Sequence, residues 1–273
     1  MKKTHRSCFL GAVSLITIAS STHAATVFSS TFTGTNTTVA YTSPPAGNNA
    51  TNAANLNTGT QVGTWLADPT STGTSGTAVQ VSTGTLNGMT SPWLLIGRAG
   101  NDTTHLSTAT MDLEGAGVAL NGTTISLTAN LINSGGQNGG LLITGYTSSG
   151  TALFTSVMGN GGSFGQRDLS TASDTAGTLD DTDLDVWSAN NTSATISFAL
   201  GTSNYTITGD GGTTNLAGSY FNSGTLDRIE LKAVGSKALW GIDNISVVAI
   251  PEPSSTCLLG LAGLACILRR RKI

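Results

Sequence analysis

Apolar residues in the central part of this 273-residue chain alternate with polar ones, and this two-residue period limits what the chain can fold into. Successive side chains of a β-strand point to opposite faces, so alternation is typical of a strand buried on one face. The clearest runs are Ile125, Leu127, Ala129 and Leu131; Ile196, Phe198 and Leu200; Tyr205 and Ile207; and Ile229, Leu231 and Ala233. No amphipathic helix of convincing length accompanies them. We therefore expect an all-β fold.

Glycine-rich turns separate these runs, as at residues 135–136, 159–162 and 210–212. Strands of ordinary length would number about ten to thirteen. Two runs, Trp93–Ile96 and Leu141–Ile143, are apolar enough to be buried on both faces. We predict a single β-sandwich, jelly-roll or lectin-like. A β-helix ranks second, because the sequence shows no fixed repeat.

The first 24 residues have the parts of a secretory signal peptide. A positively charged start precedes an apolar run at residues 8–19, and small residues lead to Ala24. We expect this signal helix to be removed, so that the exported body is residues 25–249. A buried N-terminal helix is a poorer explanation, because the run has no polar face.

The opposite end, residues 250–273, combines three features. Pro251-Glu252-Pro253 resists helix and strand, because each proline fixes φ and lacks an N–H. The uncharged apolar run 257–268 would form a helix of about 18 Å, short of the ~30 Å hydrocarbon core of a membrane. The basic residues Arg269, Arg270, Arg271 and Lys272 follow, and such a cluster stays on the cytoplasmic side. We expect a short transmembrane helix, with the body outside the cytoplasm.

In this order the three features closely resemble the PEP-CTERM sorting signal of Gram-negative bacteria, a tail also known as the ice-binding protein C-terminal domain. The resemblance implies export by the general secretion route, a temporary anchor in the inner membrane and processing by an exosortase. Pro251, Glu252 and Pro253 would be the sorting motif. It also implies a final place at the cell surface or in the extracellular matrix, together with exopolysaccharide and biofilm. The resemblance covers residues 250–273 and nothing upstream.

Cysteine content and charge narrow the chemistry of the body. All three cysteines lie in the two ends, so the body has neither a disulfide nor a thiolate metal site. Residues 25–249 keep fourteen acidic and five basic side chains, a net charge of −9 against −3 for the whole chain. Nucleic acid is an unsuitable partner, because phosphate binding needs clustered Lys and Arg. Cations or neutral glycans fit this charge better.

The last body segment predicts two strands, 226–234 and 238–248, joined as a hairpin at Gly235-Ser236. Its ending, residues 242–247, loosely resembles the final strand of PEP-CTERM ectodomains and of carbohydrate-binding jelly rolls. That resemblance implies a structural Ca²⁺ at Asp243 and Asn244. Calcium needs six to eight oxygen ligands and this pair supplies few. An acid that caps a bulge or turn is the alternative.

Residues suited to catalysis are few. His105 is the only histidine of the body, and no G-x-S-x-G motif surrounds a serine. A glycosidase needs two carboxylates roughly 5–9 Å apart, for which the body offers Glu114, Glu230 and its aspartates. The acidic cluster at residues 180–185 lacks the Gly and the final Glu of an EF-hand loop, so we interpret it as a solvated loop, with loose cation binding as the alternative.

Two further groups of residues could contact a ligand. Trp93 and Trp240 lie in apolar runs that predict core packing, whereas Trp65 and Trp187 have more polar neighbours and could stack on sugar rings. The threonine-rich runs 31–38 and 70–77 would suit ice binding only as a flat, regular ladder, and the sequence has no such repeat.

These observations lead to one expectation and two alternatives. We expect a non-enzymatic surface or matrix protein that is associated with exopolysaccharide and able to bind glycans, although the sequence does not identify the ligand-binding residues. The first alternative is a glycan-active hydrolase or lyase on the same scaffold. The second is a structural envelope protein without a ligand.

Overall fold

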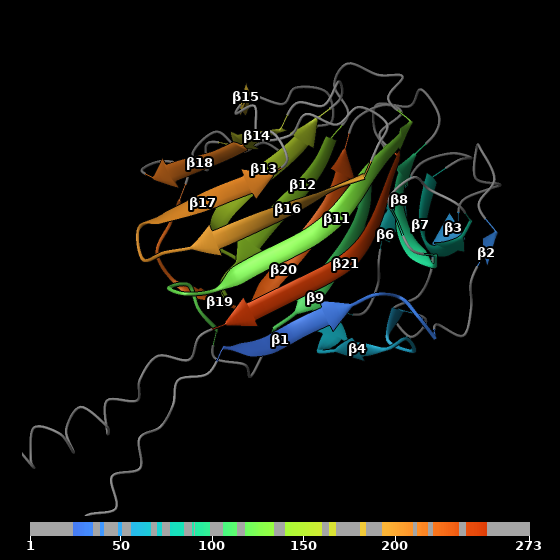
Figure 1. Cartoon of the computed structure of the whole chain (residues 1–273), viewed down its shortest axis with the longest axis horizontal. Helices are drawn as coiled ribbons and strands as arrows, with labels where there is room; N and C mark the ends of the chain where they lie inside the picture. Colours follow the sequence, from blue (N-terminus) through green and yellow to red (C-terminus); the bar gives the residue numbers. More distant parts are fainter. Residues whose placement is uncertain are drawn as a thin grey trace, which may run out of the picture. The chain divides into compact units, whose positions relative to one another are not determined.

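The computed structural model of the chain describes one compact unit that lies within Ala24–Pro251. The described residues are 24–34, 39–40, 49–50, 56–66, 70–72, 77–84, 89, 91–98, 106–113, 118–133, 140–159, 164–167, 181–183, 193–209, 212–217, 221–234 and 239–249. Their regular structure is β-strand (Figure 1). Among them, no helix has the length and apolar character needed to cross a membrane.

The first sheet contains eleven strands. Its continuous order is β18 (Gly212–Ala217), β17 (Asn204–Gly209), β16 (Ser193–Leu200), β11 (Thr124–Asn133), β21 (Leu239–Ala249), β8 (Trp93–Arg98), β7 (Thr77–Thr83) and β2 (Val39–Ala40). Three more strands join it at the side: β1 (Ala25–Ser30) beside β21, β4 (Gln61–Val62) beside β1, and β3 (Asn49–Ala50) beside β7. Except for β2 and β3, which run parallel to β7, the pairs are antiparallel.

The second sheet contains eight strands. Its order is β15 (Asp181–Asp183), β14 (Phe164–Arg167), β13 (Ala152–Gly159), β12 (Gly140–Tyr146), β20 (Arg228–Val234), β9 (Leu106–Asp112) and β5 (Thr64–Trp65), with β6 (Thr70–Thr72) also paired to β9. A small third sheet joins β10 (Val118–Ala119) to β19 (Thr225–Leu226). Thirteen of the described strands have four or more residues, which agrees with the number predicted from the sequence.

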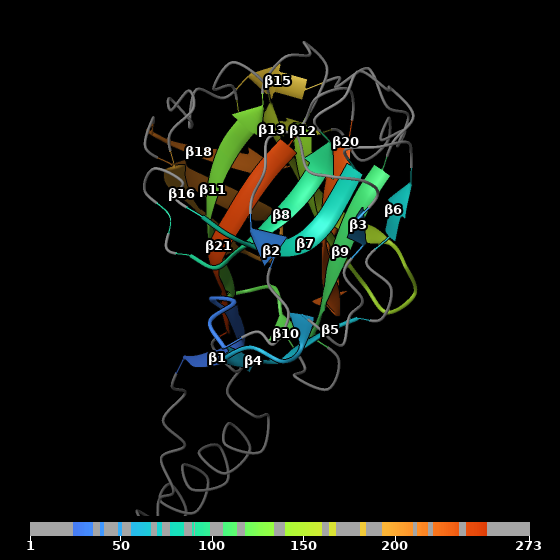
Figure 2. The same cartoon turned by 90° about the vertical axis from the view of Figure 1, so that its right-hand side faces the viewer.

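The two large sheets lie face to face, and their facing side chains form one hydrophobic core (Figures 1 and 2). The core includes residues of the predicted alternating runs, at 125–129, 196–200, 205–207 and 229–233. Each fully buried Leu, Ile or Phe side chain contributes about 1.5–3 kcal/mol to the stability of the fold, compared with the same side chain left exposed. The predicted β-sandwich is therefore confirmed. The β-helix alternative is excluded, because strands distant in sequence pair antiparallel.

Two strands are buried on both faces, as their composition predicts. Trp93, Leu94, Leu95 and Ile96 of β8 are completely buried, although only Leu94 and Ile96 belong to the main core. The segment Leu141–Ile143 of β12 is buried in the same way.

The predicted hairpin of the last two strands is wrong. Both strands exist, as β20 and β21, but β20 pairs with β12 and β9 in the second sheet, whereas β21 pairs with β11, β8 and β1 in the first. The chain between them therefore crosses from one sheet to the other. The apolar sides of both strands face the shared core, so alternation alone could not distinguish an arch between sheets from a hairpin within one.

Strand β21 changes its neighbour halfway along. One side pairs with β11, while the other pairs first with β8, as far as Ile242, and then with β1, from Ile245. Asp243 and Asn244 lie at this change, where the register with β11 also shifts. Asn244 has a φ of 52°, in the left-handed region that Asn tolerates better than most residues. The two residues form a β-bulge.

The bulge reverses which side chains of β21 face the core. Trp240 and Ile242 belong to the core before it, and Ile245 and Val247 belong to it afterwards. A strand of eleven residues can therefore keep an apolar side against the core while it serves two different neighbours.

Candidate functional site

The predicted metal residues, Asp243 and Asn244, hold the bulge of β21 together. Asp243 is buried, with 1% of its surface exposed, whereas Asn244 is exposed. The backbone N–H of Asn244 donates to Oδ1 of Asp243 (2.8 Å), and its side-chain Nδ2 donates to Oδ2 (3.3 Å). The carboxylate thus accepts from the neighbouring backbone and amide groups at the point where regular pairing is interrupted.

These contacts do not assemble a calcium shell. In the part of the chain that the structure describes, no three His, Cys, Asp or Glu side chains are grouped so that they could hold a metal ion. Calcium requires six to eight oxygens, and Asp243 belongs to no such group among the described residues. The residues fit a capped bulge, and calcium at Asp243 and Asn244 stays a prediction.

The remaining residues singled out from the sequence divide into two groups. The sorting motif (Pro251, Glu252 and Pro253), the basic cluster (Arg269, Arg270, Arg271 and Lys272), His105, Glu114 and Trp187 lie outside the described residues. Of the acidic cluster, only the backbone of Asp181–Asp183 is described, as β15. Glu230 lies on β20.

The three described tryptophans are packing residues. Trp93 and Trp240 have no exposed surface, which confirms their predicted burial, and Trp65 is 1% exposed. The Trp65 ring contacts Phe28 edge-on and stacks on Phe32, with ring centroids 5.2 Å and 6.0 Å away. None of these rings is available to stack on a sugar.

The outer side of the first sheet carries a surface that the sequence did not reveal. We call it the hydroxyl face: the outward side chains of β1, β21, β11, β16, β17 and β18. One residue from each strand forms a row across it. In strand order, the row is Ser29, Ser246, Ser126, Ser197, Thr208 and Thr213. All six side chains are partly or fully exposed, so the row is accessible to a ligand.

Two neighbouring rows extend this surface. On one side, the row contains Thr26, Val248, Thr124, Ala199, Thr206 and Asn215. On the other side, Asp243, Thr128 and Thr195 lie opposite one another. Strands are about 4.8 Å apart and same-side residues along a strand about 6.8 Å apart, so polar groups recur in both directions.

Several of these polar groups bond to each other. The hydroxyls of Thr128 and Thr195 lie 3.1 Å apart, as do those of Thr208 and Thr213. Asn204 Nδ2 donates to Asn215 Oδ1 at 2.9 Å. These bonds between adjacent strands fix hydroxyls and amides in place, which lowers the entropy cost of a further hydrogen bond to a ligand.

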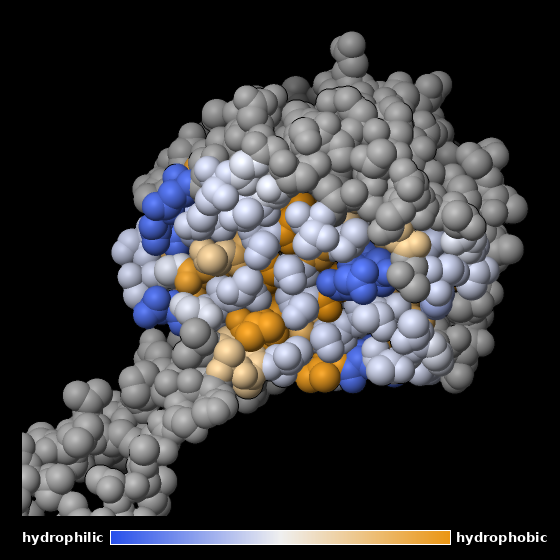
Figure 3. Space-filling model, viewed as in Figure 1, coloured by the Kyte–Doolittle hydropathy of each residue, from blue (hydrophilic) through white to orange (hydrophobic). Residues whose placement is uncertain are grey.

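Charge is nearly absent from this surface. Among its described side chains the only charged one is Asp243, which is buried. Figure 3 looks onto this side of the molecule and shows mainly pale, weakly hydrophilic residues, with smaller apolar and strongly hydrophilic areas. The surface is therefore rich in neutral hydrogen-bonding groups.

The outer side of the second sheet differs in its chemistry. Arg228, Glu230 and Lys232 alternate with the core residues of β20 and point outward. Arg228 lies opposite Asp112 of β9, and Glu230 lies opposite Thr110. The four charged side chains together have no net charge, because Arg228 and Lys232 are basic and the other two are acidic. The strand register places the Asp112 carboxylate beside Arg228.

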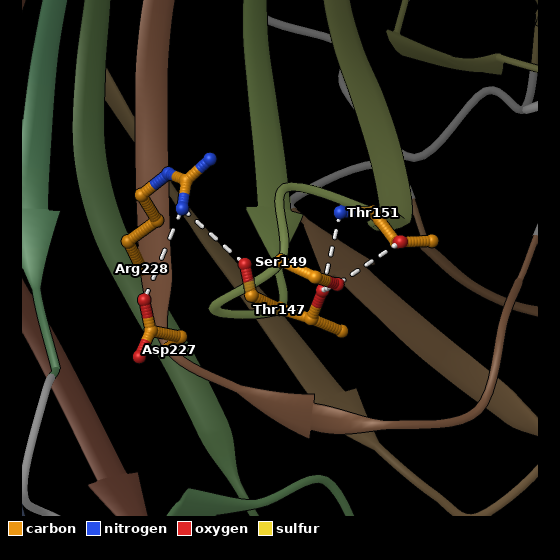
Figure 4. A network of polar contacts seen from close by, with 5 residues as sticks. All are labelled: Thr147, Ser149, Thr151, Asp227 and Arg228. Carbon is orange, nitrogen blue, oxygen red and sulfur yellow. Dashed lines mark hydrogen bonds and ion pairs between the residues drawn. The ribbon is translucent and has the colours of Figure 1, made fainter.

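Arg228 also connects two strands of the second sheet (Figure 4). Its Nη1 donates to the backbone carbonyl of Thr147 (3.3 Å) and lies 3.9 Å from an oxygen of Asp227. Its guanidinium stacks 4.9 Å from the centroid of the Tyr146 ring. Within the adjacent turn, the hydroxyl of Thr147 accepts from the backbone N–H of Thr151 (3.1 Å) and bonds the hydroxyl of Ser149 (2.8 Å). These contacts give Arg228 a structural role.

Comparison with known families identifies the tail. Residues 249–272 match the family described as the PEP-CTERM protein-sorting motif. The predicted recognition of this tail is therefore confirmed. A comparison with curated proteins gives no match.

Solved structures offer distant likenesses to the sandwich. A sialidase shares 13% sequence identity at a TM-score of 0.44, over 61% of this chain, which spans only 16% of the sialidase. Alginate lyase A1-II', a member of polysaccharide lyase family-7, shares 14% identity at a TM-score of 0.39, over 59% of this chain and 82% of the lyase. The Ca²⁺-bound exoplasmic/lumenal domain of VIP36 shares 8% identity at a TM-score of 0.43, over 69% of this chain and 84% of that domain.

Proposed function

We propose that this chain is a non-enzymatic surface or matrix protein, exported and then sorted by an exosortase through its C-terminal tail. The observation that carries the proposal is the PEP-CTERM motif at residues 249–272. Export brings the body outside the cytoplasm, and the tail holds it at the inner membrane until processing. The final location is the cell surface or the extracellular matrix.

The position at which the last strand ends supports processing of the chain within its C-terminal tail. The last strand, β21, ends at Ala249, and its final residues pair with β1 and β11. In the sequence, the sorting motif at residues 251–253 follows the last residue of this strand. Removal of the tail would leave every described strand with its described partners.

Association with extracellular polysaccharide is the role that we propose for the sandwich. The hydroxyl face offers neutral donors and acceptors on fixed strands, which suits the hydroxyl groups of glycans. The charged side chains of β20 and β9 are balanced by opposite charges, which supports a structural role for them and a non-enzymatic function for the domain.

Sorting can be tested with two matched triple variants in the native host. Pro251→Ala, Glu252→Gln and Pro253→Ala together should leave the protein in the membrane fraction, because the extended recognition element is lost. Replacing Ser254, Ser255 and Thr256 by alanine alters the same number of neighbouring residues and should leave release normal. Equal release of both variants would disprove the sorting role of the motif.

A glycan-active hydrolase or lyase is the second candidate, favoured by one observation. Glu230 and Asp112 occupy diagonal positions on neighbouring strands, where Cα atoms are about 7–8 Å apart. Side chains at that spacing can bring two carboxyl groups to the roughly 5–9 Å separation of a glycosidase pair. The purified protein should nevertheless release no reducing or unsaturated sugars from polysaccharides. Activity that Glu230→Gln abolishes, with an unchanged unfolding temperature, would replace the non-enzymatic proposal by this one.

A further inference from the structure

We propose that the hydroxyl face binds a neutral polysaccharide, lying flat across strands β1, β21, β11, β16, β17 and β18. The inference rests on the proposed association with polysaccharide and adds the surface and the ligand class. The protein places these hydroxyls in one row by strand register, although the six residues lie between positions 29 and 246 of the sequence.

The dimensions of the surface suit an extended polymer. A row of six adjacent strands spans about 24 Å between its outer strands, and neighbouring rows lie about 6.8 Å away. Most polar side chains of these rows are partly or fully exposed, namely Thr26, Thr124, Thr195, Thr206 and Asn215, whereas Thr128 and Asp243 are buried. A chain of several sugar units could therefore form hydrogen bonds from successive units to successive strands.

The charge of the protein selects a neutral polymer. The body carries a net charge of −9, so its field repels polymers of uronic acids or sulfated sugars. The described side chains of the hydroxyl face include no Lys or Arg that could pair with a carboxylate or sulfate. When a neutral glycan binds, hydroxyl groups of the protein and of the sugar replace their hydrogen bonds to water by hydrogen bonds to each other. No charged group has to be buried in this exchange.

The described tryptophans and Tyr205 do not provide a competing surface. The described tryptophans are buried, and Tyr205 packs inside the core against Phe154, with centroids 5.4 Å apart. Recognition by the sheet would therefore depend on many hydrogen bonds of small individual effect, about 0.5–1.5 kcal/mol each. Such a surface favours a long polymer over a short oligosaccharide, because contacts along one chain act together.

The test measures retention of the full chain, purified in a mild detergent, on two insoluble matrices. Microcrystalline cellulose is the neutral probe, and calcium alginate gel is the acidic probe. The variant with Thr195→Glu and Thr208→Glu adds two carboxylates to the hydroxyl face, where both positions are exposed and not opposite each other. The control with Ser223→Glu and Thr225→Glu adds the same charge at two exposed positions away from this face.

We expect the native chain and the control to be retained on cellulose and excluded from alginate. The face variant should bind cellulose at least about tenfold more weakly, because each carboxylate loses water without gaining a partner. Thermal unfolding checks that both variants are folded. Thr213→Glu, on the edge strand β18, replaces the double variant if that one is unstable, and it should weaken retention in the same direction.

The outcomes separate the surface from the function. If both double variants are retained on cellulose as strongly as each other, the assignment to the hydroxyl face is overturned, while association with polysaccharide still stands. Retention on alginate alone would overturn the neutral ligand class. Retention on neither matrix would overturn the inference together with the polysaccharide part of the proposed function, whereas sorting by the tail would stand on its own test.

Discussion

Ala25 pairs with Ala249, so the first residue of β1 lies opposite the last residue of β21. Ala25 is also the residue after the predicted signal cleavage, and Ala249 is the last strand residue before the sorting motif. The two processing points therefore border the same end of one pair of strands. Each cut would leave the described pairing of β1 with β21 in place.

This relationship predicts that residues 25–249 fold alone. Their unfolding midpoint in urea should equal that of the processed protein, because every described strand is retained. Phe28→Ala should lower the free energy of unfolding by about 3–5 kcal/mol, because Phe28 is fully buried against Trp65. Val27→Ala, at a partly buried position of the same strand, is the control and should cost much less. If Phe28→Ala left the free energy of unfolding unchanged, β1 would not pack against the core as described.

The bulge of β21 can be tested at Asp243. Asp243→Ala leaves the N–H of Asn244 without its carboxylate partner and should destabilise the fold by about 1–3 kcal/mol. Asn244→Gly should be nearly neutral, whereas Asn244→Val should cost about 1–2 kcal/mol, because a β-branched residue tolerates φ of 52° poorly. The measurement is urea unfolding.

The same variants examine the predicted calcium. A capped bulge implies that native stability is unchanged by EGTA or by added Ca²⁺. A rise in unfolding temperature with Ca²⁺ that Asp243→Ala abolishes would instead establish the predicted metal site, in which ligands from the rest of the chain complete the shell.

Much of this architecture follows from alternation in the sequence. Ile229, Leu231 and Ala233 identify a strand and its buried side, and the core contains all three. Alternation does not identify the partners of a strand. For this reason the sequence predicts one hairpin for β20 and β21, although the two strands belong to different sheets. Pairing depends on which neighbours bury the same apolar side, and that choice is not local in sequence.

The hydroxyl face illustrates the same limit for the site. Ser126 and Ser197 are separated by seventy-one positions, yet the register of β11 and β16 places them opposite each other. A search for a threonine repeat misses such a row, because each strand contributes a single member. The outward position of each hydroxyl could be predicted from its apolar neighbours, but the row could not.

Close packing at Gly145 gives a prediction about the second sheet. A Cβ added there would lie against the Phe154 ring and 2.8 Å from Leu226 Cδ1. Gly145→Ala should therefore destabilise the domain by about 1–3 kcal/mol through overpacking. The double variant with Phe154→Leu should show a positive coupling, in which part of that cost is recovered. If the destabilisation of the double variant equalled the sum of the two single variants, the Phe154 ring would not be the group that a Cβ at position 145 contacts.

Arg228 provides a comparison between two kinds of contact. Arg228→Met removes the bond to the Thr147 carbonyl and the stacking on Tyr146, and should cost about 1–2 kcal/mol. Asp227→Asn removes only an ion pair of 3.9 Å whose side chains are 28% and 25% exposed, and should change stability by less than about 0.5 kcal/mol. Chemical denaturation measures the loss of stability in each variant. A larger loss for Asp227→Asn than for Arg228→Met would contradict this prediction.

The mass of the mature protein, recovered from the native host with and without its exosortase, tests the central claim most directly. With the exosortase present, we predict a protein that begins at Ala25 and lacks Arg269, Arg270, Arg271 and Lys272, because the tail is a sorting signal that is cut away. Without it, the same protein should keep the tail through Ile273 and remain in the membrane fraction. A mature protein that keeps Arg269–Ile273 in both strains would contradict the account and make the tail a permanent anchor.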